Sequence, residues 1–93
     1  MTLDDRYGHV KSIWVAGDLH SFHKIFTIIP KSIISEDMGL NYGRFARKIN
    51  KPELLSFREL QHMSRLTGVD LKSLVELVLA DIEEERQTLS RQR

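Results

Sequence analysis

Apolar residues recur every three or four positions along most of the chain, with polar residues between them. That spacing is typical of helices that bury one face and expose the other. It is clearest in three segments: 22–29, with Phe22, Ile25, Phe26 and Ile29; 56–67, with Leu60, Met63 and Leu66; and 71–86, with Leu71, Leu74, Val75, Val78 and Ile82. We therefore predict an all-α protein, a compact bundle of about five helices.

Polar residues and glycines indicate where these helices begin and end. Ser21 can cap the first of the three, and Ser56 with Glu59 has the spacing of a capping box. Gly68 is expected to end the second helix, and Asp70 to cap the third. The predicted organisation is an N-terminal segment that packs on the core (1–20), a core domain (21–86) and a frayed tail (87–93).

The segment from Tyr7 to Ala16 allows two interpretations. Val10, Ile13 and Trp14 have helical spacing, with an aspartate before the segment to cap it and a glycine after it. However, the run from Ile13 to Val15 is also rich in residues that favour strands. The sequence leaves helix and strand open here.

Residues 30–51 have the pattern of two short helices joined by a tight turn. Pro30 suits a helix start, and Ile34 and Met38 lie one turn apart on one face. Gly39 stands where a helix ends in the left-handed conformation, and Asn41 is a good N-cap for the next helix. We predict that this next helix covers 42–50.

The predicted helix at 42–50 is apolar on one side and basic on the other. Phe45 and Ile49 are expected to face the core. No acidic residue occurs between Gly39 and Pro52, whereas four cations do: Arg44, Arg47, Lys48 and Lys51. A small basic helix after a tight turn is what a helix-turn-helix needs to place a helix in the major groove of DNA.

Gly43 is unusual inside this helix, because glycine costs roughly 1 kcal/mol in a helix interior. It fits either a close approach of the backbone to nucleic acid or a loose first turn.

Several packing and turn positions resemble the phage-repressor-like (Cro/C1, Xre-type) DNA-binding family. The resemblance covers about residues 21–80 and runs through Ile34-Ser35, Met38-Gly39-Leu40-Asn41, Phe45, Ser56-Phe57-Arg58-Glu59-Leu60 and Met63-Ser64-Arg65-Leu66-Thr67-Gly68-Val69. More narrowly, residues 29–60 are similar to small single-domain regulators of Bacteroidetes-like bacteria. The resemblance implies a lambda-repressor-like fold and DNA binding.

Three positions depart from the family's pattern. Lys31 replaces a frequent glutamine, Lys48 replaces an apolar residue, and Asn50-Lys51-Pro52 replaces a Glu-x-Gly sequence. These departures affect what the resemblance implies about base specificity and about the angle at which the chain leaves the second helix of the pair.

From the resemblance and the basic face together, we expect the chain to be a sequence-specific binder of double-stranded DNA and a transcriptional regulator. The expected DNA-binding residues are Lys31, Asn41, Tyr42, Arg44, Arg47, Lys48 and Lys51. Arg44 is the first choice for reading a base, since arginine can donate two hydrogen bonds to guanine. Lys31 and Lys51 are expected to hold phosphates.

Composition narrows the alternatives. The chain has 93 residues, enough for one core, and a formal net charge of +1. It has no cysteine, which excludes disulfides and zinc fingers. No long apolar run or signal peptide is visible, so we expect a cytoplasmic protein without membrane contact.

The last predicted helix is acidic and has more apolar residues than one buried face needs. Leu77 and Leu79 lie outside the main stripe, beside Ile82. They indicate either a homodimer through this helix or coverage by Ile13 and Trp14 of the N-terminal segment.

The sequence offers no pattern for catalysis, a cofactor, a metal or a small-molecule ligand. His20 and His23 are three residues apart but lack further ligands at suitable spacing, so capping or exposed histidines are expected. The alternative to DNA binding is a protein-interaction module on the same scaffold, as a homodimer or with an antitoxin-like role.

Overall fold

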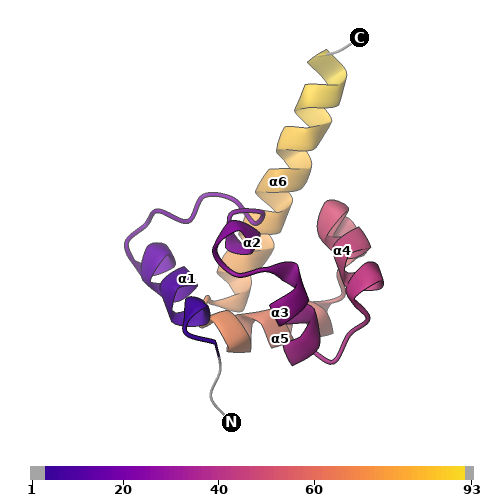
Figure 1. Cartoon of the computed structure of the whole chain (residues 1–93). Coiled ribbons are helices and arrows are strands. Elements are labelled where there is room, and N and C mark those ends of the chain that lie inside the picture. The colour runs from indigo at the N-terminus through magenta and orange to yellow at the C-terminus, as the bar shows by residue number, and fades with distance from the viewer. Residues whose placement is uncertain (1–3, 92–93) are drawn as a thin grey trace.

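The computed structural model describes residues 4–91 and contains six α-helices and one short 3-10 helix in that range. In chain order they are α1 (Arg6–Val15), α2 (Ile25–Ile28), α3 (Lys31–Asp37), α4 (Tyr42–Asn50), η1 (Pro52–Leu54), α5 (Phe57–Thr67) and α6 (Leu71–Arg91). The described residues contain no strand. The predicted all-α class is confirmed (Figure 1).

The segment that allowed two interpretations forms the helix α1 (Arg6–Val15), so the strand alternative is wrong. Tyr7 and Val10 are buried on its inner face. Asp4 accepts hydrogen bonds from the backbone N–H and the guanidinium of Arg6, which hold the pKa of Asp4 at about 2. The start of α1 therefore uses the carboxylate that lies two residues before the helix.

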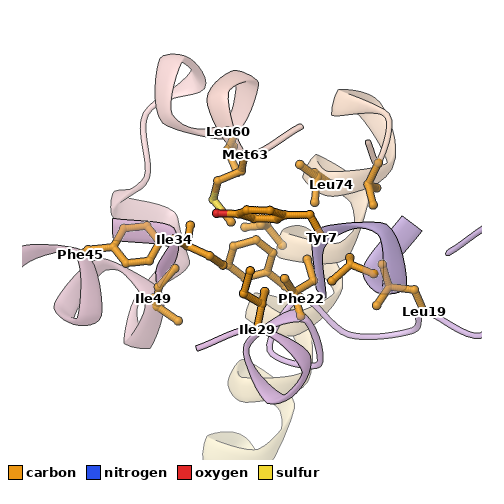
Figure 2. Packing of buried hydrophobic residues seen from close by; sticks show 14 residues of the cluster. Tyr7, Leu19, Phe22, Ile29, Ile34, Phe45, Ile49, Leu60, Met63 and Leu74 are labelled. Carbon is orange, nitrogen blue, oxygen red and sulfur yellow. The ribbon is translucent and has the colours of Figure 1, made fainter. Parts of the chain in front are cut away.

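The core forms where the six α-helices and the loop before α2 meet. Figure 2 shows Phe45 and Ile49 of α4 pointing toward the centre, where Tyr7, Phe22 and Met63 lie. All but Tyr7 are fully buried, and Tyr7 is only 3 % exposed. Such close packing fixes the position of each helix against the others.

Helix α2 is shorter than predicted. Residues 22–24 form turns, and the helix begins at Ile25. Ser21 does not cap it: the N-cap is Lys24, and the Ser21 hydroxyl accepts the N–H of His23 and donates to the carboxylate of Asp81 in α6. Phe22, Ile25 and Ile29 are nevertheless fully buried, as the predicted stripe required.

The two turns that matter most use left-handed glycines. Gly39 (φ 68°) ends α3, and Gly68 (φ 77°) ends α5. Other residues rarely adopt this conformation. A side chain at Gly68 would also lie 2.8 Å from the Cδ of Lys11, so α1 passes close to this turn.

Helix α5 begins with the predicted capping box. Ser56 accepts the N–H of Glu59 at 3.1 Å, and Glu59 accepts the N–H of Ser56 at 2.9 Å. The segment before it is the 3-10 helix η1, which opens with the buried Pro52. Together they set the path from α4 to α5.

Helix α6 is longer than predicted, and its last part extends beyond the other helices (Figure 1). It continues to Arg91, so the tail expected to be frayed at 87–93 is helical as far as the structure describes it. No glycine or proline follows Gly68, and residues 83–87 are mostly good helix formers. Within residues 4–91, no helix combines the length and apolar content needed to cross a bilayer.

Candidate nucleic-acid interface

Helices α3 and α4 and the turn between them form a helix-turn-helix arrangement. The turn closes with hydrogen bonds from the N–H groups of Gly39 and Leu40 to the carbonyls of Glu36 and Ser35, at 3.0 and 2.8 Å. Asn41 caps α4, because its side-chain oxygen accepts the N–H of Arg44 at 3.1 Å. The predicted turn and cap are confirmed.

The inner face of α4 fixes the helix to the core. Phe45 and Ile49 are fully buried, and the ring of Phe45 lies edge-on to that of Phe26, with centroids 6.1 Å apart. On the side of α3, Ser35 is buried and its hydroxyl donates to the carbonyl of Ser32. Ser35 is small and its hydroxyl is hydrogen-bonded within α3, so it allows α3 to pack closely against α4.

The opposite face of α4 is open to solvent and positively charged. Tyr42, Arg44, Arg47 and the following Lys51 are all exposed, and Tyr42 is 55 % exposed despite its large ring. No ion pair joins these three cations to any residue that the structure describes. Their charges are therefore available to a polyanion.

Lys48 differs from the other cations of α4. Its ammonium group lies 2.8 Å from the carboxylate of Glu59, and its side chain is only 35 % exposed. Burial raises the pKa of Glu59, but hydrogen bonds from Lys48 and from the Ser56 backbone outweigh this effect and lower it overall. Glu59 thus caps α5 and holds Lys48 at the same time.

The other sequence-predicted residues lie at helix starts. Lys31 is the first residue of α3 and is partly buried. Asn41 is exposed, but its side-chain oxygen is occupied by the cap. A shallow cavity of about 220 Å³ lies beside it, with walls that include Arg44, Lys48 and Glu59.

Gly43 lies in the first turn of α4 with ordinary helical geometry. A Cβ at this position would be 3.3 Å from the side-chain oxygen of Asn41, tighter than ordinary van der Waals contact. Crowding of the cap is therefore a further physical reason for glycine here.

Two long-range polar contacts hold the helix-turn-helix in place. The Tyr7 hydroxyl of α1 donates to Asp37 at the end of α3, at 2.6 Å. Burial, and then this hydrogen bond to an anion, raise the pKa of Tyr7. The second contact is made by the His23 ring, which comes from the turns before α2. It lies 2.6 Å from Asp81 in α6 and 3.1 Å from the carbonyl oxygen of Ile49, near the end of α4.

Sequence reasoning missed both contacts. Asp81 is 58 residues from His23, and Asp37 is 30 residues from Tyr7. No local spacing in the sequence connects such pairs. The sequence indicated these contacts only through isolated polar residues beside apolar stripes. His20 is exposed, and the His23 side chain is 49 % exposed in spite of its two contacts.

The three residues predicted for a dimer interface differ in their exposure to solvent. Leu77 and Ile82 are partly buried and pack against the core, whereas Leu79 is 59 % exposed. Ile13 and Trp14 of α1 are also partly buried against the core. Other exposed apolar side chains, Leu54 and Phe57, follow α4 in the chain and flank the start of α5.

Residues 4–91 contain no group of three or more histidine, aspartate or glutamate side chains placed to hold a metal ion. The features that define the candidate site are the geometry of its helices and its positive charge. No family model, curated protein or solved structure matches the chain significantly.

Proposed function

We propose that the chain binds double-stranded DNA in the manner of a phage-repressor-like (Xre-type) regulator, with α4 in the major groove. One observation carries the proposal: α4 buries Phe45 and Ile49 completely, and it exposes Tyr42, Arg44 and Arg47. A helix anchored in this way presents its charges on a rigid support.

The dimensions of α4 suit the groove. An α-helix with its side chains is about 10–12 Å across. The major groove of B-DNA is about 12 Å wide and admits an α-helix. The turn before α4 is short and capped, so the N-terminal end of the helix, which carries Tyr42 and Arg44, can approach the bases.

The exposed residues divide into two roles. Arg44 lies in the first turn of α4 and can donate two hydrogen bonds to a guanine. Arg47 lies one turn later, and Lys51 follows the helix. In the proposed complex, Lys51 and Lys31, which lies at the start of α3, would hold phosphates rather than bases.

The first test is a titration of the purified chain onto mixed-sequence duplex DNA, followed by fluorescence anisotropy between ~50 and ~200 mM salt. Micromolar or tighter binding that weakens steeply with salt would support the proposal. A folded protein that does not bind even at the lowest salt would refute it.

The second candidate is a protein-interaction module on the same scaffold, and the exposure of Leu79, Leu54 and Phe57 favours it. A homodimer through α6 would serve either function, because dimeric helix-turn-helix proteins contact two half-sites about 34 Å apart. Light scattering at tens of micromolar measures this directly. A monomeric mass for the free chain would contradict the dimer without affecting the binding test.

A further inference from the structure

The ring of His23 joins two helices that are far apart in sequence. Its Nδ1 lies 2.6 Å from the Oδ2 atom of Asp81 in α6. Its Nε2 lies 3.1 Å from the backbone oxygen of Ile49, in the last turn of α4. The ring therefore bridges α6 and the C-terminal end of the helix that carries the candidate DNA-binding residues.

Both neighbours of the ring are hydrogen-bond acceptors. A backbone carbonyl has no proton to donate, so Nε2 must carry one. The Asp81 carboxylate already accepts from the Ser21 hydroxyl and the His23 backbone N–H, and its side chain is only 8 % exposed. A neutral imidazole has a single N–H, whereas the imidazolium has two. Only the protonated ring can donate to both acceptors.

The His23 side chain is 49 % exposed and lies beside a cleft lined by acidic and neutral groups. His23 lines an open cleft of about 430 Å³ with six other residues: Ser21, Asn50, Asp81, Glu84, Glu85 and Thr88. The charged groups that face the ring from α6 are all acidic, namely Asp81, Glu84 and Glu85, and α4 contributes the neutral Asn50 and the Ile49 carbonyl. A positive charge at the C-terminal end of α4 also agrees with the helix dipole.

We propose that His23 is a positioning residue for α4. Its imidazolium links the C-terminal end of α4 to α6, and loss of the proton breaks one of the two hydrogen bonds and loosens that end, although the Ile49 side chain stays buried. The inference rests on the proposed DNA binding, because α4 is the helix that would enter the groove. Histidine changes charge between about pH 5 and about pH 8, so DNA affinity is expected to fall as the pH rises through this interval.

The binding test compares DNA affinity at about pH 6 and about pH 8, at constant ionic strength. Three variants are needed: His23→Asn, His23→Gln and His20→Gln. Asparagine places its nitrogen near Nδ1 and retains the bond to Asp81, whereas glutamine places its nitrogen near Nε2 and favours the Ile49 carbonyl. His20 is an exposed neighbour with no side-chain hydrogen bond to a described residue, so it is the matched control.

In the wild type and His20→Gln, we expect affinity to fall roughly two- to tenfold between the two pH values, the range given by one hydrogen bond. His23→Asn should bind at pH 6 as weakly as the wild type at pH 8, with little further change. His23→Gln should recover part of the pH 6 affinity and show no histidine-dependent pH profile. A His23→Asn profile with the same slope as the wild type would overturn the inference.

A measurement without DNA separates this inference from the proposed function. Long-range ¹H–¹⁵N spectra of the wild-type imidazole nitrogens identify the protonation state of His23, and amide hydrogen exchange reports on residues 49–51. We expect a doubly protonated ring at about pH 6 and faster exchange at 49–51 as that proton is lost. A neutral ring at pH 6, or exchange at 49–51 that does not follow the His23 titration, would refute the positioning role even if DNA binds. Failure to bind DNA, with the expected spectra, would refute the proposed function and the effect on affinity, but not the bridge.

Discussion

At the scale of the residue, the four cations of the α4 region are not equivalent. Arg44, Arg47 and Lys51 are exposed, whereas Lys48 is held by Glu59. In the proposed complex, the free cations would meet DNA without first breaking a contact. Lys48 would have to leave a partner whose carboxylate also caps α5, so its contribution to binding is expected to be smaller.

Replacing Arg44 by alanine should cost roughly 1–3 kcal/mol of binding free energy and relax base preference at one position. Replacing Lys51 should weaken all sequences equally and lower the salt slope by about one unit. Anisotropy titrations on a selected site and a scrambled duplex distinguish these outcomes. If Arg44→Ala retained both affinity and preference, the base-reading role would belong to another side chain.

Glu59 gives a prediction for acid stability. The pKa of Glu59 is lowered in the folded protein, so its stabilising effect is complete above the pKa of the unfolded chain and is lost as the pH falls through the folded value. Between about pH 5 and about pH 3, the free energy of unfolding should decrease more in the wild type than in Glu59→Gln.

Glutamine can still close the capping box. At pH 7, Glu59→Gln should therefore cost only up to about 1 kcal/mol, the scale of a partly exposed ion pair. Urea denaturation at several pH values measures both effects. Identical pH profiles for the two proteins would show that the contact with Lys48 contributes no pH-dependent stability.

At the scale of the element, α4 depends on how its ends are held. It has only nine residues, and an isolated helix of that length is marginal in water. Its start is capped by Asn41, its middle is buried through Phe45, and its end is bonded to His23. Each contact restrains a different turn of the helix, which would otherwise fray from either end.

The cap can be tested by Asn41→Ala, which should lower the free energy of unfolding by roughly 0.5–2 kcal/mol. Asn41→Asp is the matched control, because a carboxylate can accept the same N–H from Arg44 and also suits a helix start. Chemical denaturation followed by circular dichroism measures both variants. Equal losses in the two would mean that another property of Asn41 matters.

At the scale of the whole molecule, α1 and α6 support the helix-turn-helix through side-chain hydrogen bonds. Tyr7 of α1 bonds to the end of α3, and Asp81 of α6 bonds to the ring that holds α4. The last part of α6 then extends away from the bundle (Figure 1). Leu79 is the exposed large apolar residue of that helix among the described side chains.

Tyr7→Phe tests the bond between α1 and α3 without removing the buried ring. We expect a loss of roughly 0.5–1.5 kcal/mol in the free energy of unfolding, since Asp37 is exposed and water can replace the hydroxyl. Tyr7→Ala, which also removes the buried ring, should cost clearly more, because deletion of a buried aromatic ring costs about 3–5 kcal/mol. If Tyr7→Phe were as destabilising as Tyr7→Ala, the hydrogen bond would be the dominant contribution.

Local patterns in the sequence determined the helices α3, α4 and α5, the turn at Gly39, the cap at Asn41 and the capping box of α5, but they left helix and strand open for α1. Each of these features depends on residues within about four positions, where spacing and backbone preference act directly. The same rules placed Phe45 and Ile49 inside and the cations of α4 outside.

Only the tertiary structure decided the pairings across the chain. It turned Ser21 from a cap into a partner of Asp81, attached Lys48 to Glu59, and placed His23 between Asp81 and the end of α4. These contacts join residues from different elements, and side-chain polarity alone does not specify which partner a buried polar group will find. Packing of the apolar faces brings the elements together, and the polar groups left at their edges then bond to whatever lies within reach.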